Sequence, residues 1–322
     1  MKVRQSVLGA VASIMVFALS ATPALPQTKT LIGAVLYARD SQFWQQVELG
    51  MRDAAKTYDV DLQVALSRRQ LPTEAAVIDD LVTRGVKALV ISPLDKDASA
   101  TAVKNAKAKG VETIEFNTFF ADRNIASHSI GVDNKELAAS VGREIAKAIS
   151  TDFQGDAKIG LIPLPAINPG SAVRKNGLLS ALTGVKYQIV GEIEAATPEK
   201  GANAVEDILR RDPSTQIIWA SNSGSLAGAA NTVDHSGDKV QLYGIDMSEE
   251  LAREMLNSTG HVMAVSDQQP YKLGFLSIET AVKSLKGEKV SRDIEVPVKL
   301  YSRSNPADLN DYLKVIQSLR AQ

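Results

Sequence analysis

Short apolar runs alternate with amphipathic stretches along most of the chain. Residues 31–37 form an apolar run of the length of a buried strand, and Trp44, Val47 and Met51 follow at helical spacing after the polar residues 38–42. The same pattern predicts strands at 60–66, 88–92, 112–116 and 128–132, and helices at 44–58, 73–84, 98–109 and 133–149. Strands separated by helices are typical of βαβ units, so we expect a parallel sheet with helices on both faces.

The alternation starts again after Gly155. It predicts strands at 158–163, 187–193, 216–220 and 241–245, and helices at 172–182, 200–210, 225–236 and 248–258. Residues 80–93 and 207–222 both read as a helix end, a basic residue, a turn and an apolar strand with a polar end. The sequence therefore predicts an α/β fold with two doubly wound parallel-sheet domains of similar architecture.

The last part of the chain contains too few elements for a third core. It predicts a strand at 262–266, a helix at 271–286, a strand at 294–301 and a helix at 308–319. We expect these residues to cross back to the first domain and return to the second. The expected N-terminal lobe is 30–132 plus 267–294, the expected C-terminal lobe is 133–266 plus 295–322, and several crossing segments form a hinge with a ligand cleft between the lobes.

The first residues have the pattern of a signal peptide. Lys2 and Arg4 precede an apolar core at 7–19, which is too short to span a bilayer, and small residues follow. We expect residues 1–24 to be removed, with cleavage after Ala24, or after Ala21 as the alternative. This segment predicts export of the mature protein.

Composition then excludes several classes of function. The chain has 322 residues, 44% of them hydrophobic, and a net charge of −1, which leaves no basic footprint for nucleic acid or an anionic membrane surface. It has no cysteine, which excludes disulfides, a thiolate nucleophile, an iron–sulfur cluster and a cysteine-based zinc site. We expect no cofactor and no metal.

Polar and aromatic residues occupy the predicted carboxyl ends of the strands, where open α/β sheets bind ligands. They are Phe43, Trp44, Ser92, Asp95, Glu115, Asn117, Arg174, Asn222, Asp246, Asp267 and Gln268. These residues include no pair of catalytic carboxylates and no nucleophile with a base, and the three histidines, at 128, 235 and 261, lie far apart in sequence. The pattern indicates a binding protein rather than an enzyme.

Each of these residues also has a structural interpretation. Phe43 and Trp44 can be packing between helix and sheet, and Arg174 can be a surface salt-bridge residue. Asp246 can cap a helix, and Asn222 can form a turn. Ser92 and Asp95 fit a strand end and a helix cap, whereas Glu115 stays undecided between a cleft carboxylate and an exposed one.

Several local motifs resemble the periplasmic sugar-binding proteins of the ribose-binding type, which are substrate receptors of ABC transporters. The resemblance runs from Leu31 to about Tyr301 through SQFW, LVTRGVKALVISP, SHSIGVDN, SAVRKNGL, ASNS, YGIDM and DQQPYKLG. It implies that Phe43 and Trp44 stack on the faces of a sugar and that Arg174 binds hydroxyls or a ring oxygen. It also implies ligand contacts for Asn117, Asn222, Asp246 and Gln268.

The chain departs from that family at two ligand positions. Asn117-Thr118 replaces the usual Asp-Arg, and the aromatic residue of the second lobe falls near Ala196. The expected ligand is therefore a small sugar or polyol of undetermined identity. The resemblance further implies a periplasmic monomer that closes on its ligand and delivers it to an ABC permease in the inner membrane. The alternative is a sensing protein of the same fold that signals to a sensor kinase or chemoreceptor.

Overall fold

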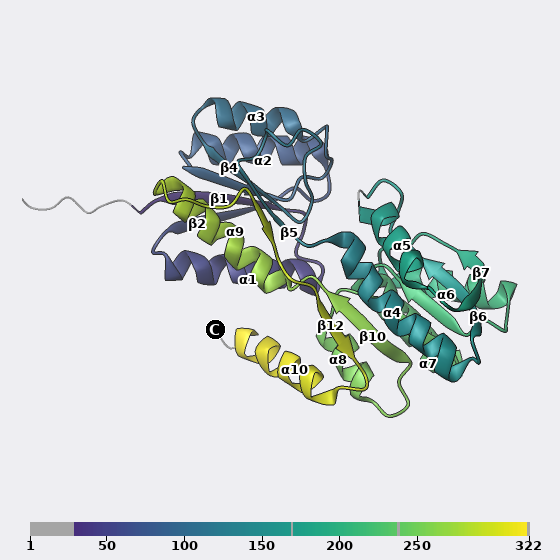
Figure 1. Cartoon of the computed structure of the whole chain (residues 1–322). Coiled ribbons are helices and arrows are strands. Elements are labelled where there is room, and N and C mark those ends of the chain that lie inside the picture. The colour runs from purple at the N-terminus through teal and green to yellow at the C-terminus, as the bar shows by residue number, and fades with distance from the viewer. Residues whose placement is uncertain (1–28, 169, 237–238, 321–322) are drawn as a thin grey trace, which may run out of the picture.

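The computed structural model describes residues 29–168, 170–236 and 239–320, which form two α/β lobes side by side (Figure 1). Within this part of the chain each lobe contains a six-stranded sheet, with strand order β11-β5-β4-β3-β1-β2 in the N-terminal lobe and β12-β10-β9-β8-β6-β7 in the C-terminal lobe. The two orders are the same, and the pairs are parallel except for β12, which runs antiparallel to β10. The predicted fold class is confirmed.

The elements follow the alternation of apolar runs and amphipathic stretches. The N-terminal lobe contains β1 (Leu31–Leu36), α1 (Gln42–Thr57), β2 (Asp61–Leu66), α2 (Leu71–Thr83), β3 (Ala88–Ile91), α3 (Ala100–Ala108), β4 (Glu112–Phe116), β5 (His128–Gly131), α9 (Pro270–Leu285) and β11 (Asp293–Glu295). The C-terminal lobe contains α4 (Asn134–Asp152), β6 (Asp156–Ile162), α5 (Gly170–Ala181), β7 (Lys186–Glu192), α6 (Pro198–Arg211), β8 (Ile217–Ala220), α7 (Ser223–Ser236), β9 (Gln241–Ile245), α8 (Glu249–Leu256), β10 (Val262–Asp267), β12 (Lys299–Ser302) and α10 (Pro306–Arg320).

One predicted strand is wrong. Residues 294–301 are two short strands in different sheets, β11 beside β5 and β12 beside β10. Pro297 lies between them, and a proline cannot donate the backbone hydrogen bond that a continuous strand needs. The break lets the chain leave one sheet and enter the other.

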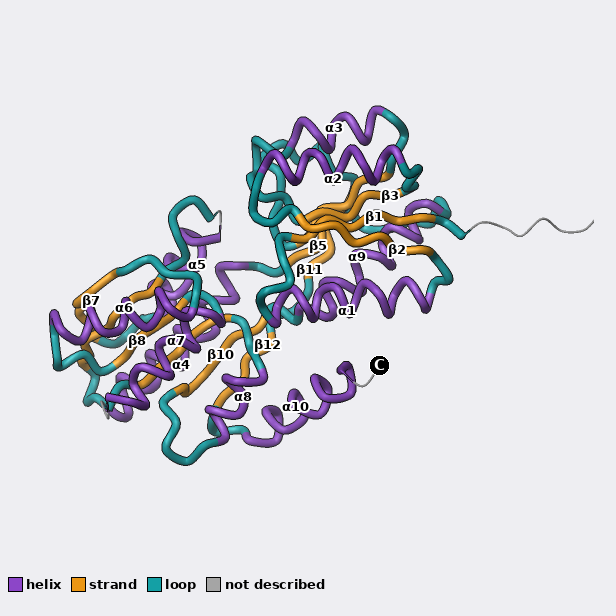
Figure 2. Tube along the Cα trace, turned by 180° about the vertical axis from the view of Figure 1, so that it is seen from behind, coloured by secondary structure: helices purple, strands orange, loops and turns teal. Residues whose placement is uncertain are grey.

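The chain passes between the lobes at three places in its described part. These connections are β5 to α4, β10 to α9 and β11 to β12, and they run close together in the middle of the molecule (Figure 2). Lobes joined by a few short segments of this kind can rotate relative to one another while each core stays packed.

Two glycines allow α1 and α9 to approach closely. A Cβ atom on Gly50 would lie 2.0 Å from the carbonyl oxygen of Tyr271, and one on Gly274 would lie 1.9 Å from that of Val47. Both separations are far below a van der Waals contact, so only glycine fits at either position. This packing fixes α1, whose first turn carries Phe43 and Trp44.

The predicted signal peptide, residues 1–24, lies outside the described residues. Among the residues that the structure does describe, no helix combines the length and the apolar character needed to cross a bilayer.

Candidate ligand site at the facing strand ends

Asn117 and Asp246 occupy equivalent positions in the two lobes. Asn117 follows β4 and Asp246 follows β9, and each of these strands is fourth in the order of its sheet counted from the β2 or β7 edge. Both residues have left-handed backbone conformations, with φ of 61° and 69°, which Asn and Asp tolerate better than most residues. Their backbone amides donate to Ile130 O and Ser266 O at 2.9 and 2.8 Å. The shared geometry directs one polar side chain from each lobe at the same edge of its sheet.

Three further polar side chains surround Asn117 in the N-terminal lobe. Asn117 Nδ2 donates to Ser92 Oγ at 3.2 Å, and Tyr37 Oη donates to Pro93 O at 2.7 Å while lying 3.2 Å from Thr118 Oγ1. Burial raises the pKa of Tyr37, so its phenol stays protonated. These side chains form a wall without charge. Tyr37 and Thr118 were not predicted as site residues, although Tyr37 ends the first apolar run at the strand edge.

Phe43 and Trp44 form one aromatic group with their neighbours. The Trp44 ring centroid lies 4.7 Å from that of Tyr37, 5.0 Å from that of Phe43 and 6.3 Å from that of Phe116. Phe43 is 8% exposed and Trp44 6% exposed. The two rings therefore contribute to the core of the N-terminal lobe, and only a small part of each side chain remains accessible.

Arg174 is the central cation of the C-terminal half of the site. It is 6% exposed, so the alternative of a surface salt-bridge residue is wrong. Its Nε donates to Asn134 Oδ1 at 2.8 Å and its Nη1 donates to Ser221 O at 2.9 Å, with Asp246 Oδ2 at 3.9 Å from Nη1. Burial lowers the pKa of Arg174, and the neighbouring Asp246 carboxylate opposes that shift.

Asp246 and Gln268 complete this buried group. Gln268 Nε2 donates to Asp246 Oδ1 at 2.6 Å. Burial raises the pKa of Asp246, while Arg174 and the Gln268 amide lower it. The alternative that Asp246 caps α8 is wrong, because Ser248 is the N-cap and accepts from Leu251 N.

Asp267 is a second buried carboxyl beside Asp246. Its Oδ1 accepts from Met247 N at 3.0 Å and its Oδ2 accepts from Gln269 N at 2.9 Å. Burial and the Asp246 charge raise the pKa of Asp267 to about 7, against the opposing effect of its two backbone donors. Asp267 therefore fixes the backbone at Met247, next to Asp246, and at Gln269, next to Gln268.

Two other residues from the strand ends, Asn222 and Asp95, form hydrogen bonds within their own lobes. Asn222 Oδ1 accepts from Ser225 N at 3.0 Å and its Nδ2 donates to Ala196 O at 2.9 Å, so it forms the turn before α7. Asp95 Oδ1 accepts from Asp97 N and Ala98 N.

Glu115, which the sequence left undecided, is fully buried within β4. It forms a 2.7 Å ion pair with Arg123 and accepts from Ser129 Oγ at 2.6 Å and from Phe120 N at 2.7 Å. Burial raises the pKa of Glu115. Its oxygens are therefore occupied within its own lobe.

The structure thus joins the predicted residues into two groups. Arg174, Asp246 and Gln268 form one group, and Phe43 and Trp44 form another, whereas Asn117 contacts Ser92 near the aromatic group. Among the described residues, no hydrogen bond or ion pair connects the N-terminal group with the C-terminal one. Within the described ranges, no three His, Cys, Asp or Glu side chains are placed to hold a metal ion.

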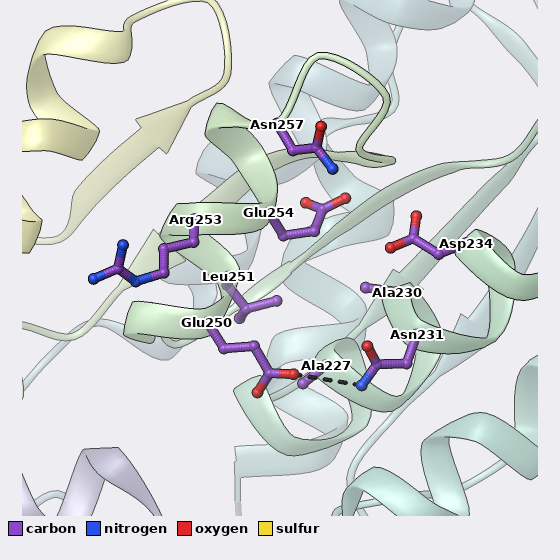
Figure 3. A pocket seen from close by; sticks show the side chains of 9 residues that line it. All are labelled: Ala227, Ala230, Asn231, Asp234, Glu250, Leu251, Arg253, Glu254 and Asn257. Atoms are coloured by element: carbon purple, nitrogen blue, oxygen red, sulfur yellow. Dashed lines mark hydrogen bonds between the residues drawn. The ribbon is translucent and has the colours of Figure 1, made fainter.

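A cavity of about 280 Å³ lies elsewhere, between α7 and α8 of the C-terminal lobe (Figure 3). Its polar lining includes Asn231, whose Nδ2 lies 3.4 Å from Glu250 Oε1, and Glu254, whose carboxylate accepts from Val262 N. None of the predicted site residues lines it.

The chain is similar in sequence and in fold to known proteins. The profile of the periplasmic binding protein domain family matches residues 32–289. Ribose import binding protein RbsB from Haemophilus influenzae is 31% identical over 266 residues, 82% of this chain and 88% of that protein. Ribose import binding protein RbsB from Escherichia coli K12 is 30% identical over 288 residues, 88% of this chain and 94% of that protein. A periplasmic solute-binding protein of an ABC transporter from Actinobacillus succinogenes, solved with bound D-allose, has a TM-score of 0.80 at 21% identity and covers 87% of this chain and 100% of its own.

Proposed function

This chain belongs to the periplasmic binding protein domain family, and we propose that it is the receptor of an ABC transporter that binds a small sugar or polyol. The family is one of solute-binding receptors rather than enzymes. The RbsB relatives are named for ribose import, and the solved neighbour holds D-allose. The two departures at the ligand positions keep either sugar from being assigned to this chain.

The buried Arg174–Asp246–Gln268 group carries the proposal. Arg174 Nη2 has no hydrogen-bond partner among the described residues, and Asp246 keeps acceptor positions beyond its bond to Gln268. A donor that closure around a ligand removes from water costs about 1–3 kcal/mol unless the ligand satisfies it. A hydroxyl group both donates and accepts, so two neighbouring hydroxyls of a sugar or polyol match a guanidinium beside a carboxylate.

The proposed contacts in the N-terminal lobe are mainly apolar or neutral. The accessible parts of Phe43 and Trp44 pack against the C–H face of the ligand, and Asn117 hydrogen-bonds a hydroxyl. Asn222 contributes from the C-terminal lobe only after exchanging one of its present partners. The positive charge of Arg174 and the negative charge of Asp246 cancel, and the polar side chains around Asn117 carry no charge. An uncharged ligand therefore fits this site best.

Ligand binding then acts through the hinge. A ligand that contacts Arg174 and the aromatic pair at once touches both lobes, and it stabilises the closed arrangement only by contacts absent in the open one. The closed form is the species that a membrane permease recognises. No observation in the structure or in the relatives favours the alternative of a sensing protein.

The remaining parts of the proposal concern location and partners. We propose that residues 1–24 direct export to the periplasm, that the mature chain is a monomer, and that its partner is an ABC permease in the inner membrane. Co-purification with a permease supports this assignment, whereas co-purification with the periplasmic domain of a sensor kinase supports the signalling alternative.

A ligand screen tests the function. Purified protein is heated with pentoses, hexoses and polyols, and with sugar phosphates as charged counterparts, because a tight ligand raises the melting temperature. Calorimetry then compares the wild type with Arg174→Met and with Arg84→Met, which changes an exposed arginine at the C-cap of α2. We expect Arg174→Met to weaken binding on the order of a hundredfold and Arg84→Met to leave it unchanged. If the panel gives no stabilising ligand, or if Arg174→Met binds like the wild type, the proposal is wrong.

A further inference from the structure

The first turn of α1 contacts the C-terminal lobe through two glutamines one helical turn apart. Gln42 Oε1 accepts from Glu249 N at 2.6 Å, at the start of α8. Gln46 Nε2 donates to Tyr312 Oη at 3.1 Å, in α10. Phe43 and Trp44 lie on the same turn, so the segment that carries the aromatic pair also contacts the opposite lobe.

Tyr312 connects this turn to the ligand residues of the C-terminal lobe. Its hydroxyl donates to Met247 O at 3.2 Å, and Met247 directly follows Asp246. Gln46 and Tyr312 are each only 7% exposed, and burial raises the pKa of Tyr312, so the hydroxyl stays protonated at neutral pH. One buried hydroxyl thus accepts a hydrogen bond from one lobe and donates one within the other.

The helix that supplies Tyr312 lies beyond the family match, which ends at residue 289. It packs beside α8 and extends below α1 in both views (Figures 1 and 2). The Tyr312 ring contacts Tyr301 of β12 edge-on, with 5.3 Å between centroids. This contact holds the Tyr312 side chain in place from the core of its own lobe.

We propose that Tyr312 is a positioning residue for ligand binding, which fixes the Asp246–Met247 corner relative to the aromatic turn of α1. The inference rests on the function proposed for that site. Gln46, Tyr312 and Met247 form a continuous chain of two hydrogen bonds across the gap between the lobes. Without the Tyr312 hydroxyl, the Gln46 amide and the Met247 carbonyl lose a buried partner, and the two halves of the site are free to shift relative to each other.

The test compares Tyr312→Phe with Tyr301→Phe. Tyr301 is the matched control, because its ring belongs to the same pair while its hydroxyl makes no hydrogen bond with α1 or Met247. With the best ligand of the screen, we expect Tyr312→Phe to weaken binding by roughly five- to tenfold and Tyr301→Phe to leave it within about twofold. We expect Gln46→Leu to cause a similar loss and the double variant no further loss, because both changes break the same contact.

A second measurement does not need a ligand. The chain has no cysteine, so Lys109→Cys and Lys186→Cys place one label on each lobe, and the distance between labels reports the lobe arrangement. We expect Tyr312→Phe to broaden this distance distribution in the unliganded protein and Tyr301→Phe to leave it unchanged. Wild-type affinity and distances in Tyr312→Phe, equal effects of the two tyrosine changes, or additive losses with Gln46→Leu overturn the proposal. If no sugar or polyol binds the wild type, the proposed function fails, and the distances still decide the role of Tyr312.

Discussion

Replacing Arg174 by methionine tests how strongly the Arg174 charge stabilises the buried Asp246 carboxylate. The change keeps much of the side-chain volume and removes the charge, so Asp246 becomes a buried carboxylate without a cation. Loss of one partner of a buried ion pair costs about 3–5 kcal/mol. The Nη1–Oδ2 separation is 3.9 Å and Gln268 still donates to Asp246, so we expect a value near the lower limit, about 3 kcal/mol.

The matched variant combines Arg174→Met with Asp246→Asn. The asparagine carries no charge and its amide oxygen still accepts from Gln268, so we expect the double variant to recover most of the lost unfolding free energy. Both variants are expected to bind ligand on the order of a hundredfold more weakly than the wild type, since both lack the guanidinium. The assay is urea unfolding at pH 7, with the denaturant dependence compared to verify that the transition has not changed in character.

The pH dependence of the unfolding free energy is an independent test of the charge on Asp246. The pKa of Asp246 is raised in the folded protein and rises further without Arg174, so between the unfolded and folded pKa values the folded state binds more protons than the unfolded state. Stability from such a group is present at low pH and lost as pH rises through the folded pKa. The penalty of Arg174→Met should therefore shrink as pH falls from 7 towards 5. A single variant as stable as the wild type at pH 7, or a double variant no more stable than the single one, would refute the reasoning.

Three further predictions follow from the contacts. Trp44→Ala should abolish ligand binding in calorimetry and also lower the unfolding free energy by about 3 kcal/mol, because its ring packs in the core, whereas Trp44→Phe should keep most of the stability. Gly274→Ala should lower the melting temperature strongly, because its Cβ would lie 1.9 Å from Val47 O, while Lys272→Ala on the exposed face of α9 should not. The pKa of Asp267 is raised to about 7, so the stability from its bound proton is lost as pH rises through neutrality, and the melting temperature of the wild type relative to Asp267→Asn should fall between pH 5 and pH 8.

The sequence predicted the order and type of the elements because their apolar spacing is local and regular. Residues 44–58 and 271–286 have helical periodicity, and the structure has α1 and α9 there. The error at 294–301 arose because alternating residues on both sides of Pro297 imitate one continuous strand. Periodicity alone does not reveal which sheet each half joins.

The composition of the candidate site was predictable, and its internal contacts were not. Strand-end positions indicated Arg174 and Asp246, but their burial beside one another depends on backbone geometry, including the left-handed conformation of Asp246. Tyr37 was not predicted as a site residue because, in the sequence, it is simply the last residue of an apolar strand. Gln46 and Tyr312 are 266 residues apart, and no local pattern connects them.

The N-terminal lobe is assembled from two distant stretches of the chain, since α9 and β11 join it only after the elements from α4 to β10 of the C-terminal lobe. During synthesis, the face of α1 that α9 later covers therefore stays open until residues 270–285 have emerged from the ribosome. The first lobe to begin is therefore completed only after most of the chain has been translated.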